Sequence, residues 1–138
     1  MQNNDLDATI IKEVIFMVKV LIIEDDESLY RMYSTEMGLS GFKVVWHNKG
    51  NGVVDKAKTE NPNIILLDII LPDKDGLHIL KELKSDPLTK KVPVIMLTNF
   101  GSDANVREAL ENGAEDFLLK YKIVPAEIVQ KIRDILKV

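Results

Sequence analysis

The strongest constraint on the fold is a continuous apolar run, Ile64 to Leu67, that leads directly into Asp68. Pro62 and Pro72 bound this region, and such a run is typical of a strand buried on both faces of a parallel sheet. Asp68 stands where the strand should reach the surface, and burying an unpaired carboxylate is energetically costly. Ligands bind at the carboxyl ends of the strands in open parallel sheets, so we expect Asp68 to lie at the chemical centre of the molecule.

Composition limits the class of protein. The 138 residues, 46% hydrophobic and 29% charged, are enough for one soluble globular domain with a substantial core. The absence of cysteine excludes disulfides, thiolate metal sites and cysteine nucleophiles, and it fits a cytoplasmic location. A net charge of −4 argues against direct nucleic-acid binding, and no apolar run is long enough to span a membrane. His47 and His78 belong to no cluster of potential metal ligands, so we expect them to be structural or at the surface.

Residues 1–16 differ from the sequence that follows them. The first seven are mostly polar, and Ala8 to Phe16 is mildly apolar without a clear period. The stretch from Lys12 to Ile15 can be encoded by a purine-rich sequence that resembles a bacterial ribosome-binding site just upstream of Met17. We therefore expect an N-terminal extension outside a domain that spans residues 17–138. One interpretation is an over-extended reading frame or a disordered segment; the other is a helix that packs on the domain or mediates dimerisation.

From Val18 onward, apolar strand-like segments alternate with amphipathic helix-like segments. The strands are expected at residues 18–23, 42–46, 64–68, 93–98 and 116–120. The helices are expected at residues 28–39, 50–60, 76–85, 102–112 and 125–136. Five βα units in series predict an α/β domain with a doubly wound parallel sheet covered on both faces. Because the last helix ends the chain, we expect a stand-alone domain without a DNA-binding or catalytic output domain.

Polar side chains follow four of the five predicted strands, where a structural pattern does not require them. They are Glu24, Asp25 and Asp26 after the first strand, Asp68 after the third, Thr98 after the fourth and Lys120 after the fifth. The carboxyl ends of parallel strands share one edge, so these groups can converge, and clustered acids need a cation such as Mg²⁺. Carboxylate, hydroxyl and ammonium groups beside Mg²⁺ stabilise a phosphoryl group in transfer, and a carboxylate can accept that group as an aspartyl phosphate.

Each of these residues has a simpler interpretation when taken alone. Asp68 could be a turn or helix N-cap residue, and the acids at 24–27 could form a solvated loop that favours the positive end of the next helix. Thr98 could be an ordinary β-branched strand residue, and Lys120 could be a surface charge. Their conjunction at the strand ends of one sheet favours a shared chemical site.

Together these residues resemble the receiver domain of bacterial two-component response regulators, across essentially all of residues 17–138. The matching segments are Val20–Glu27, Leu66–Pro72, Asp75-Gly76, Val94–Thr98 and Gly113–Lys120. The resemblance implies a flavodoxin-like fold with strand order 2-1-3-4-5. It also implies a phosphorylation-activated signalling switch rather than an enzyme, one that catalyses only its own phosphotransfer and slow dephosphorylation.

The resemblance further implies roles for individual residues. Asp68 would accept a phosphoryl group from a phosphohistidine on a sensor histidine kinase or a histidine phosphotransfer protein. The cofactor would be Mg²⁺, and its ligands would be Glu24 (through water), Asp25, Asp68 and the backbone carbonyl of Ile70. Asp26 would replace one of the acid pair if the alignment shifts by one residue.

The resemblance also implies how the signal would spread. The Thr98 hydroxyl and the Lys120 ammonium would contact the phosphoryl oxygens, the lysine as a point charge. Phe117 occupies the aromatic switch position, and its ring would turn inward when Thr98 moves. Phosphorylation adds roughly two negative charges, so this repacking would alter, for a downstream protein target, the face formed by residues 102–112, 116–120 and 125–136. The two helices of this face are also a candidate homodimer interface.

Three positions depart from the family pattern. Tyr121 follows Lys120 where a cis-proline is usual, and a cis bond before any other residue costs roughly 3–4 kcal/mol. We therefore predict either a strained loop or a trans loop, which would weaken the role of Lys120 if it pulled this side chain away from Asp68. Asn99 replaces a smaller residue, and its amide would crowd or hydrogen-bond the phosphoryl group. Glu24 replaces the commoner aspartate, a variation that the family tolerates.

Three other classes of protein share parts of this pattern. A receiver-fold module that binds partners without phosphorylation would not need the complete set of site residues. A flavin-binding electron carrier of the same strand order would need a loop rich in Ser, Thr and Gly after the first strand, where this chain has acids. A Mg²⁺-dependent phosphatase would carry its nucleophile on the first strand, two residues before a second aspartate, beneath a cap. Neither of these phosphatase features is evident, so we favour the phosphorylation-dependent switch.

Overall fold

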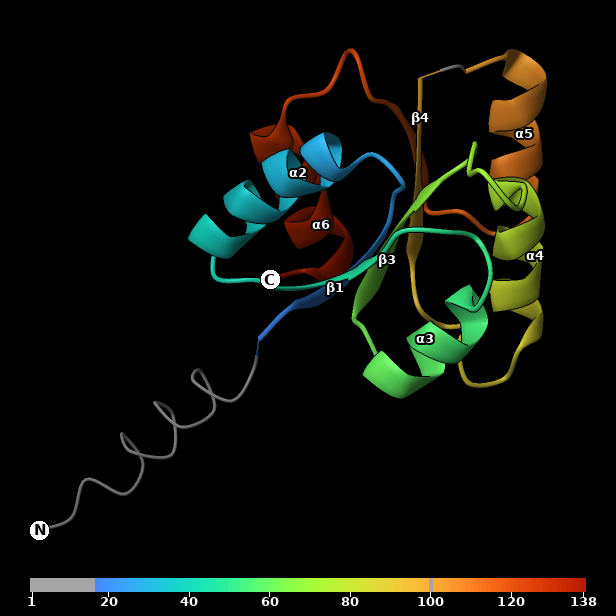
Figure 1. Cartoon of the computed structure of the whole chain (residues 1–138), viewed down its shortest axis with the longest axis horizontal. Helices are drawn as coiled ribbons and strands as arrows, with labels where there is room; N and C mark the ends of the chain where they lie inside the picture. Colours follow the sequence, from blue (N-terminus) through green and yellow to red (C-terminus); the bar gives the residue numbers. More distant parts are fainter. Residues whose placement is uncertain (1–16, 100) are drawn as a thin grey trace, which may run out of the picture.

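The computed structural model describes residues 17–99 and 101–138 of the chain. The predictions made for residues 1–16, an over-extended reading frame or an N-terminal helix, fall outside the described residues. The described residues form a single sheet with helices on both sides (Figure 1). Across these two ranges, no helix combines the length and the apolar character needed to cross a membrane.

Strands and helices alternate along the chain, as the apolar pattern predicts. The strands are β1 (Lys19–Ile23), β2 (Lys43–His47), β3 (Ile64–Asp68), β4 (Val94–Thr98) and β5 (Asp116–Leu119). The helices are α2 (Glu27–Leu39), α3 (Val53–Glu60), α4 (Gly76–Ser85), α5 (Asp103–Glu111) and α6 (Pro125–Leu136). Every strand pair is parallel and the order is β2-β1-β3-β4-β5. The flavodoxin-like fold with strand order 2-1-3-4-5 is therefore confirmed.

The central strands are buried on both faces because two helical layers cover the sheet. Alternate residues of a strand point to opposite faces, so each strand contributes to two cores. Ile65, Leu67 and Met96 pack toward α3, α4 and α5. Tyr33 of α2 and Ile132 of α6 belong to the core on the other face. Figure 1 shows α2 and α6 on one side of the sheet and α3, α4 and α5 on the other.

One helix begins later than the sequence pattern predicts. The helix expected from residue 50 begins at Val53, because the loop before it is held by another part of the chain. The Asp73 carboxylate accepts the backbone amides of Gly50 and Asn51 at 2.7 and 2.9 Å. Gly52 has a φ of 80°, a left-handed conformation that favours glycine and interrupts a helix. The other boundaries agree with the prediction to within one residue.

The strand order makes the ends of β1 and β3 the expected place for a ligand. The chain adds β2 on one side of β1 and β3 on the other, so the order changes direction at this point. Open α/β sheets bind ligands outside the carboxyl ends of the strands at such a switch point. Ile23 pairs with Leu67 in the register of β1 and β3. The next residues along each strand, Glu24 and Asp68, therefore follow at the same level of the sheet.

Candidate functional site

Asp68 is the last residue of β3 and lies at the centre of the site. It is only 5% exposed, although it ends a strand. Its Oδ1 accepts the backbone amide of Ile70 at 3.2 Å, and its Oδ2 accepts the Lys120 ammonium at 2.8 Å. Each carboxylate oxygen thus has a partner, and this pairing offsets the cost of removing the charge from water.

Glu24 follows β1 and is held at both its backbone and its side chain. Its amide donates to the His47 carbonyl at 3.1 Å, and its carbonyl accepts the Trp46 indole N–H at 2.7 Å. One carboxylate oxygen accepts the Asp26 amide at 3.2 Å, and the other accepts the Lys120 ammonium. The residue is 2% exposed, so its carboxylate is both buried and fixed in position.

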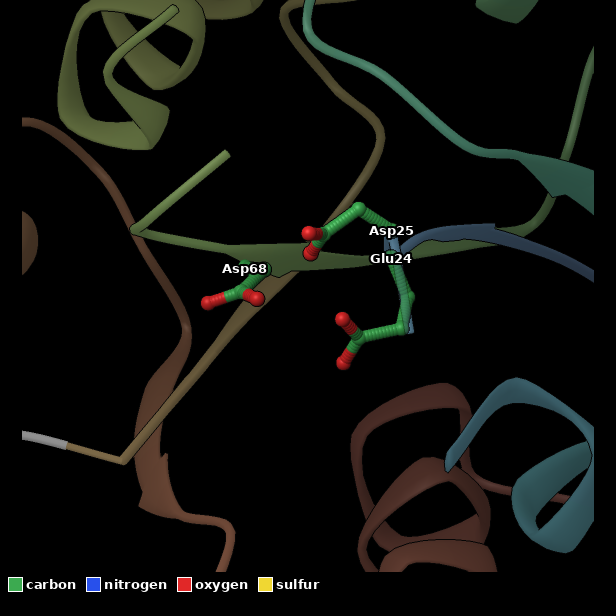
Figure 2. Close-up of side chains that lie close together, drawn as sticks. All are labelled: Glu24, Asp25 and Asp68. Atoms are coloured by element: carbon green, nitrogen blue, oxygen red, sulfur yellow. The ribbon is translucent and has the colours of Figure 1, made fainter. Parts of the chain in front are cut away.

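Asp25 is exposed and completes a cluster of three acids. One carboxylate oxygen from each of Glu24, Asp25 and Asp68 lies within 4.8 Å of the other two. Figure 2 shows these side chains converging on a common space. Asp26 caps α2 instead, because its carboxylate accepts two backbone amides at the start of this helix. Three oxygen donors around one space fit a hard divalent cation, so the geometry favours Glu24 and Asp25 over Asp26 as the acid pair.

Thr98 is the last residue of β4, and Lys120 directly follows β5. Thr98 is fully buried at the end of β4, and its carbonyl accepts the Lys120 amide at 2.8 Å. This bond extends the pairing of β4 and β5 beyond Leu119, where β5 ends one residue earlier than predicted. The Lys120 ammonium then reaches across the sheet edge and bridges Glu24 and Asp68.

The trans alternative for the Lys120–Tyr121 bond is confirmed, because the described part of the chain contains no cis peptide. The trans loop does not pull Lys120 away, since its ammonium stays 2.8 Å from Asp68 Oδ2. Tyr121 itself is mostly exposed. The departure from proline is therefore compatible with the position that the resemblance implies for Lys120.

Burial and the lysine together set the charge state of the site. Burial raises the pKa of the Glu24 carboxyl to about 7, against an ordinary 4.5, although Lys120 opposes this shift. Burial lowers the pKa of the Lys120 ammonium, but its hydrogen bonds to Asp68 and Glu24 outweigh that effect and raise it overall. Lys120 therefore stays charged at neutral pH and supplies positive charge beside the acids.

Comparison with known proteins decides the family. The family model described as the response regulator receiver domain matches residues 20–133, which include every residue of the site above. The chain belongs to this family.

Three similar proteins illustrate the relationship. The receiver domain is 32% identical over 119 residues to PhoP, the alkaline phosphatase synthesis transcriptional regulatory protein of Bacillus subtilis (strain 168). That match covers 86% of this chain and 48% of PhoP, so the chain spans about half the length of the curated relatives it matches. The BeF3-activated N-terminal receiver domain of Klebsiella pneumoniae RstA is 31% identical with a TM-score of 0.79, covering 87% of this chain and 99% of that one. The Mn(2+)-bound response regulator Rcp1 is 28% identical with a TM-score of 0.73, covering 84% of this chain and 91% of that one.

The loop after β3 brings the start of α4 close to Asp68. The Gly76 amide donates to the Ile69 carbonyl at 2.7 Å. A Cβ at Gly76 would collide with the Asp68 carbonyl oxygen and lie 2.6 Å from the Ile69 Cα, so only glycine lets α4 begin here. Ile70 is 57% exposed, and its backbone pairs with that of Asp75 in an isolated bridge. The role of the Ile70 carbonyl as a metal ligand stays a prediction.

Phe117 lies on β5, half-buried against the core that α3, α4 and α5 cover. Gly101 follows β4 and leaves room for this ring. A Cβ there would lie 3.3 Å from Phe117 Cε1 and 2.7 Å from Leu119 Cδ2. Asn99 is exposed directly after Thr98. The structure thus places the aromatic ring beside the loop that follows Thr98, while its movement stays a prediction.

The sequence did not indicate the contacts that Trp46 makes beside this site. Trp46 binds the Glu24 carbonyl, and its ring stacks on that of Tyr30. The available signal is the single tryptophan near the end of a predicted strand, and only the strand register brings it to the acids. The histidines were expected to be structural or at the surface. His47 Nε2 contacts the Asn51 carbonyl at 2.6 Å, and among the described residues the cluster of potential metal ligands includes neither His47 nor His78.

Proposed function

We propose that this chain is a phosphorylation-activated signalling switch and that Asp68 is its phosphoacceptor. The observation that carries the proposal is the bridge that Lys120 makes between Asp68 and Glu24, beside Asp25. A carboxylate in this setting can act as a nucleophile. The neighbouring ammonium and acids supply the charge and the metal ligands that stabilise a phosphoryl group in transfer.

In the proposed reaction, an Asp68 carboxylate oxygen attacks the phosphorus of a phosphohistidine. The donor is a sensor histidine kinase or a histidine phosphotransfer protein. The O–P bond forms as the P–N bond breaks, and the electron pair of the broken bond stays on the imidazole nitrogen. Lys120 exchanges its contact with Asp68 for the phosphoryl oxygens, and the Thr98 hydroxyl donates to them.

The proposed metal is Mg²⁺, with three direct protein ligands, Asp25, Asp68 and the Ile70 carbonyl, and with Glu24 bound through water. When bound, Mg²⁺ neutralises charge on the phosphoryl oxygens. The converging carboxylates support this assignment, because clustered oxygen donors suit a hard cation. The Mn(2+)-bound form of the similar Rcp1 adds support from a member of the same family.

The proposed output is a change in the face formed by α5, β5 and α6. The added phosphoryl charge would draw Thr98 toward the site, and the Phe117 ring, which packs beside Gly101, would turn inward as Thr98 moves. A downstream protein target would bind the altered face. Homodimerisation through α5 and α6, the absence of direct nucleic-acid binding by this domain and a cytoplasmic location stay predictions.

Acetyl phosphate and Mg²⁺ test the proposal when the product is measured by intact mass. We expect one phosphoryl adduct in the wild-type chain, no adduct in Asp68→Asn and no adduct after chelation of Mg²⁺. Asp55→Asn, an exposed carboxylate on α3, is the matched control and should be labelled like the wild type. An adduct that survives Asp68→Asn would contradict the assignment. No adduct in the wild type would favour the module that binds partners without phosphorylation.

A further inference from the structure

A pair of stacked aromatic rings joins the two elements that flank the acidic loop. Tyr30 lies near the start of α2, directly after this loop, and Trp46 lies on β2, the strand next to β1. The ring centroids are 4.3 Å apart and the rings are nearly parallel, at 4°. Both residues are half-buried. The stack therefore joins the edge strand β2 to α2, on either side of residues 24–26.

Trp46 also binds the acidic loop directly. Its indole N–H donates to the Glu24 carbonyl at 2.7 Å. The carbonyl of the next residue, His47, accepts the Glu24 amide at 3.1 Å. Consecutive residues of β2 thus bind both backbone polar groups of Glu24. The carbonyl that Trp46 binds belongs to the peptide joining Glu24 to Asp25, so its orientation determines where the Asp25 side chain starts.

We propose that Trp46, supported by Tyr30, is a positioning residue that sets the affinity of the acid pair for a divalent cation. The proposal rests on the proposed function, in which Glu24 and Asp25 serve Mg²⁺. The indole N–H holds the Glu24–Asp25 peptide in one orientation, and the Tyr30 ring holds the indole. Groups that orient metal ligands raise metal affinity, because less freedom is lost when the metal binds.

A purely structural role makes a different prediction, because it would lower stability and leave metal affinity unchanged. Trp46→Phe separates the two roles, since it keeps an aromatic ring and removes the N–H. Asn63 provides a matched control at the opposite end of β1, where its Oδ1 accepts the Lys19 amide at 2.8 Å. Asn63→Ala therefore removes a side-chain hydrogen bond to the same strand, away from the acids.

The experiment measures Mg²⁺ affinity of the full chain by isothermal titration calorimetry. Amide hydrogen exchange of Glu24 and Asp26, which donate to the His47 carbonyl and to the Glu24 carboxylate, is the second readout in Mg²⁺-free buffer. We expect Trp46→Phe to weaken Mg²⁺ binding about tenfold and to speed exchange at both amides. Tyr30→Leu leaves the indole in place but removes its support, so it should weaken binding in the same direction. Tyr30→Phe and Asn63→Ala should both stay within about twofold of the wild type.

The outcomes distinguish this proposal from the proposed function. Wild-type Mg²⁺ affinity and unchanged exchange in a folded Trp46→Phe would overturn the positioning role, while phosphorylation of Asp68 would still stand on its own test. If Trp46→Phe does not fold, equal affinity in Tyr30→Leu and Tyr30→Phe would overturn it. A wild-type chain that binds no Mg²⁺ would overturn both proposals. Faster amide exchange in Trp46→Phe would then show that Trp46 only stabilises the local backbone.

Discussion

The buried carboxyl of Glu24 should make the free energy of unfolding depend on pH. Burial raises its pKa to about 7, against an ordinary 4.5. One pKa unit corresponds to about 1.4 kcal/mol, so this difference amounts to about 3 kcal/mol of folding free energy. The folded state holds the proton more tightly than the unfolded state does. The resulting stabilisation is fully present below about pH 4.5 and is lost as the pH rises through about 7.

Glu24→Gln isolates this effect, because it removes the titrating group and nearly keeps the shape. Urea unfolding in the presence of a chelator gives the free energy of unfolding of both chains at a series of pH values. We expect the wild-type value to fall relative to that of the variant by up to about 3 kcal/mol between about pH 4.5 and 8. A difference that stays constant across this range would refute the argument that burial controls the Glu24 proton.

Three further predictions concern residues around the site, each measured by urea unfolding. Tyr33 Oη is buried without a hydrogen-bond partner among the described residues, so Tyr33→Phe should raise the free energy of unfolding by about 1 kcal/mol; a decrease would show that the hydroxyl is satisfied. Gly76→Ala should lower it by about 1–3 kcal/mol, because the new Cβ would collide with the Asp68 carbonyl oxygen, and wild-type stability would contradict this. Asp26→Ala should lower it by about 1 kcal/mol through loss of the α2 N-cap, while acetyl phosphate still labels Asp68; loss of labelling in the folded variant would return Asp26 to the acid pair.

The fold could be predicted because the sequence of one strand, β3, limits how the rest of the chain can pack around it. The apolar run of β3 requires burial on both faces, and this burial requires a parallel sheet between two helical layers. The positions of Glu24, Asp68 and Lys120 at one edge then follow from the topology. The start of α3 could not be predicted in this way. It depends on the Asp73 carboxylate, which binds Gly50 from 23 residues away.

The hydrogen bonds and ion pairs inside the site could not be predicted from the sequence either, because they too depend on contacts between distant residues. Parallel strands bring side chains to one edge, but they do not determine which oxygens a lysine contacts. The contact of Trp46 with Glu24 depends on the register that pairs Ile23 with His47. A slip of one residue would turn Trp46 to the other face of the sheet. The sequence therefore predicted which residues gather, and the structure added how they are connected.

The Lys120 bridge has a consequence for how the protein is made. Lys120 lies 96 residues from Glu24 and 52 from Asp68 along the chain. Because the ribosome builds the chain from its N-terminus, both acids are synthesised well before the lysine that bridges them. A fragment that ended before β5 would have to bury two carboxylates without this counter-charge, which is costly. Docking of the last strand therefore completes the fold and the site together, so an unfinished chain lacks a competent site.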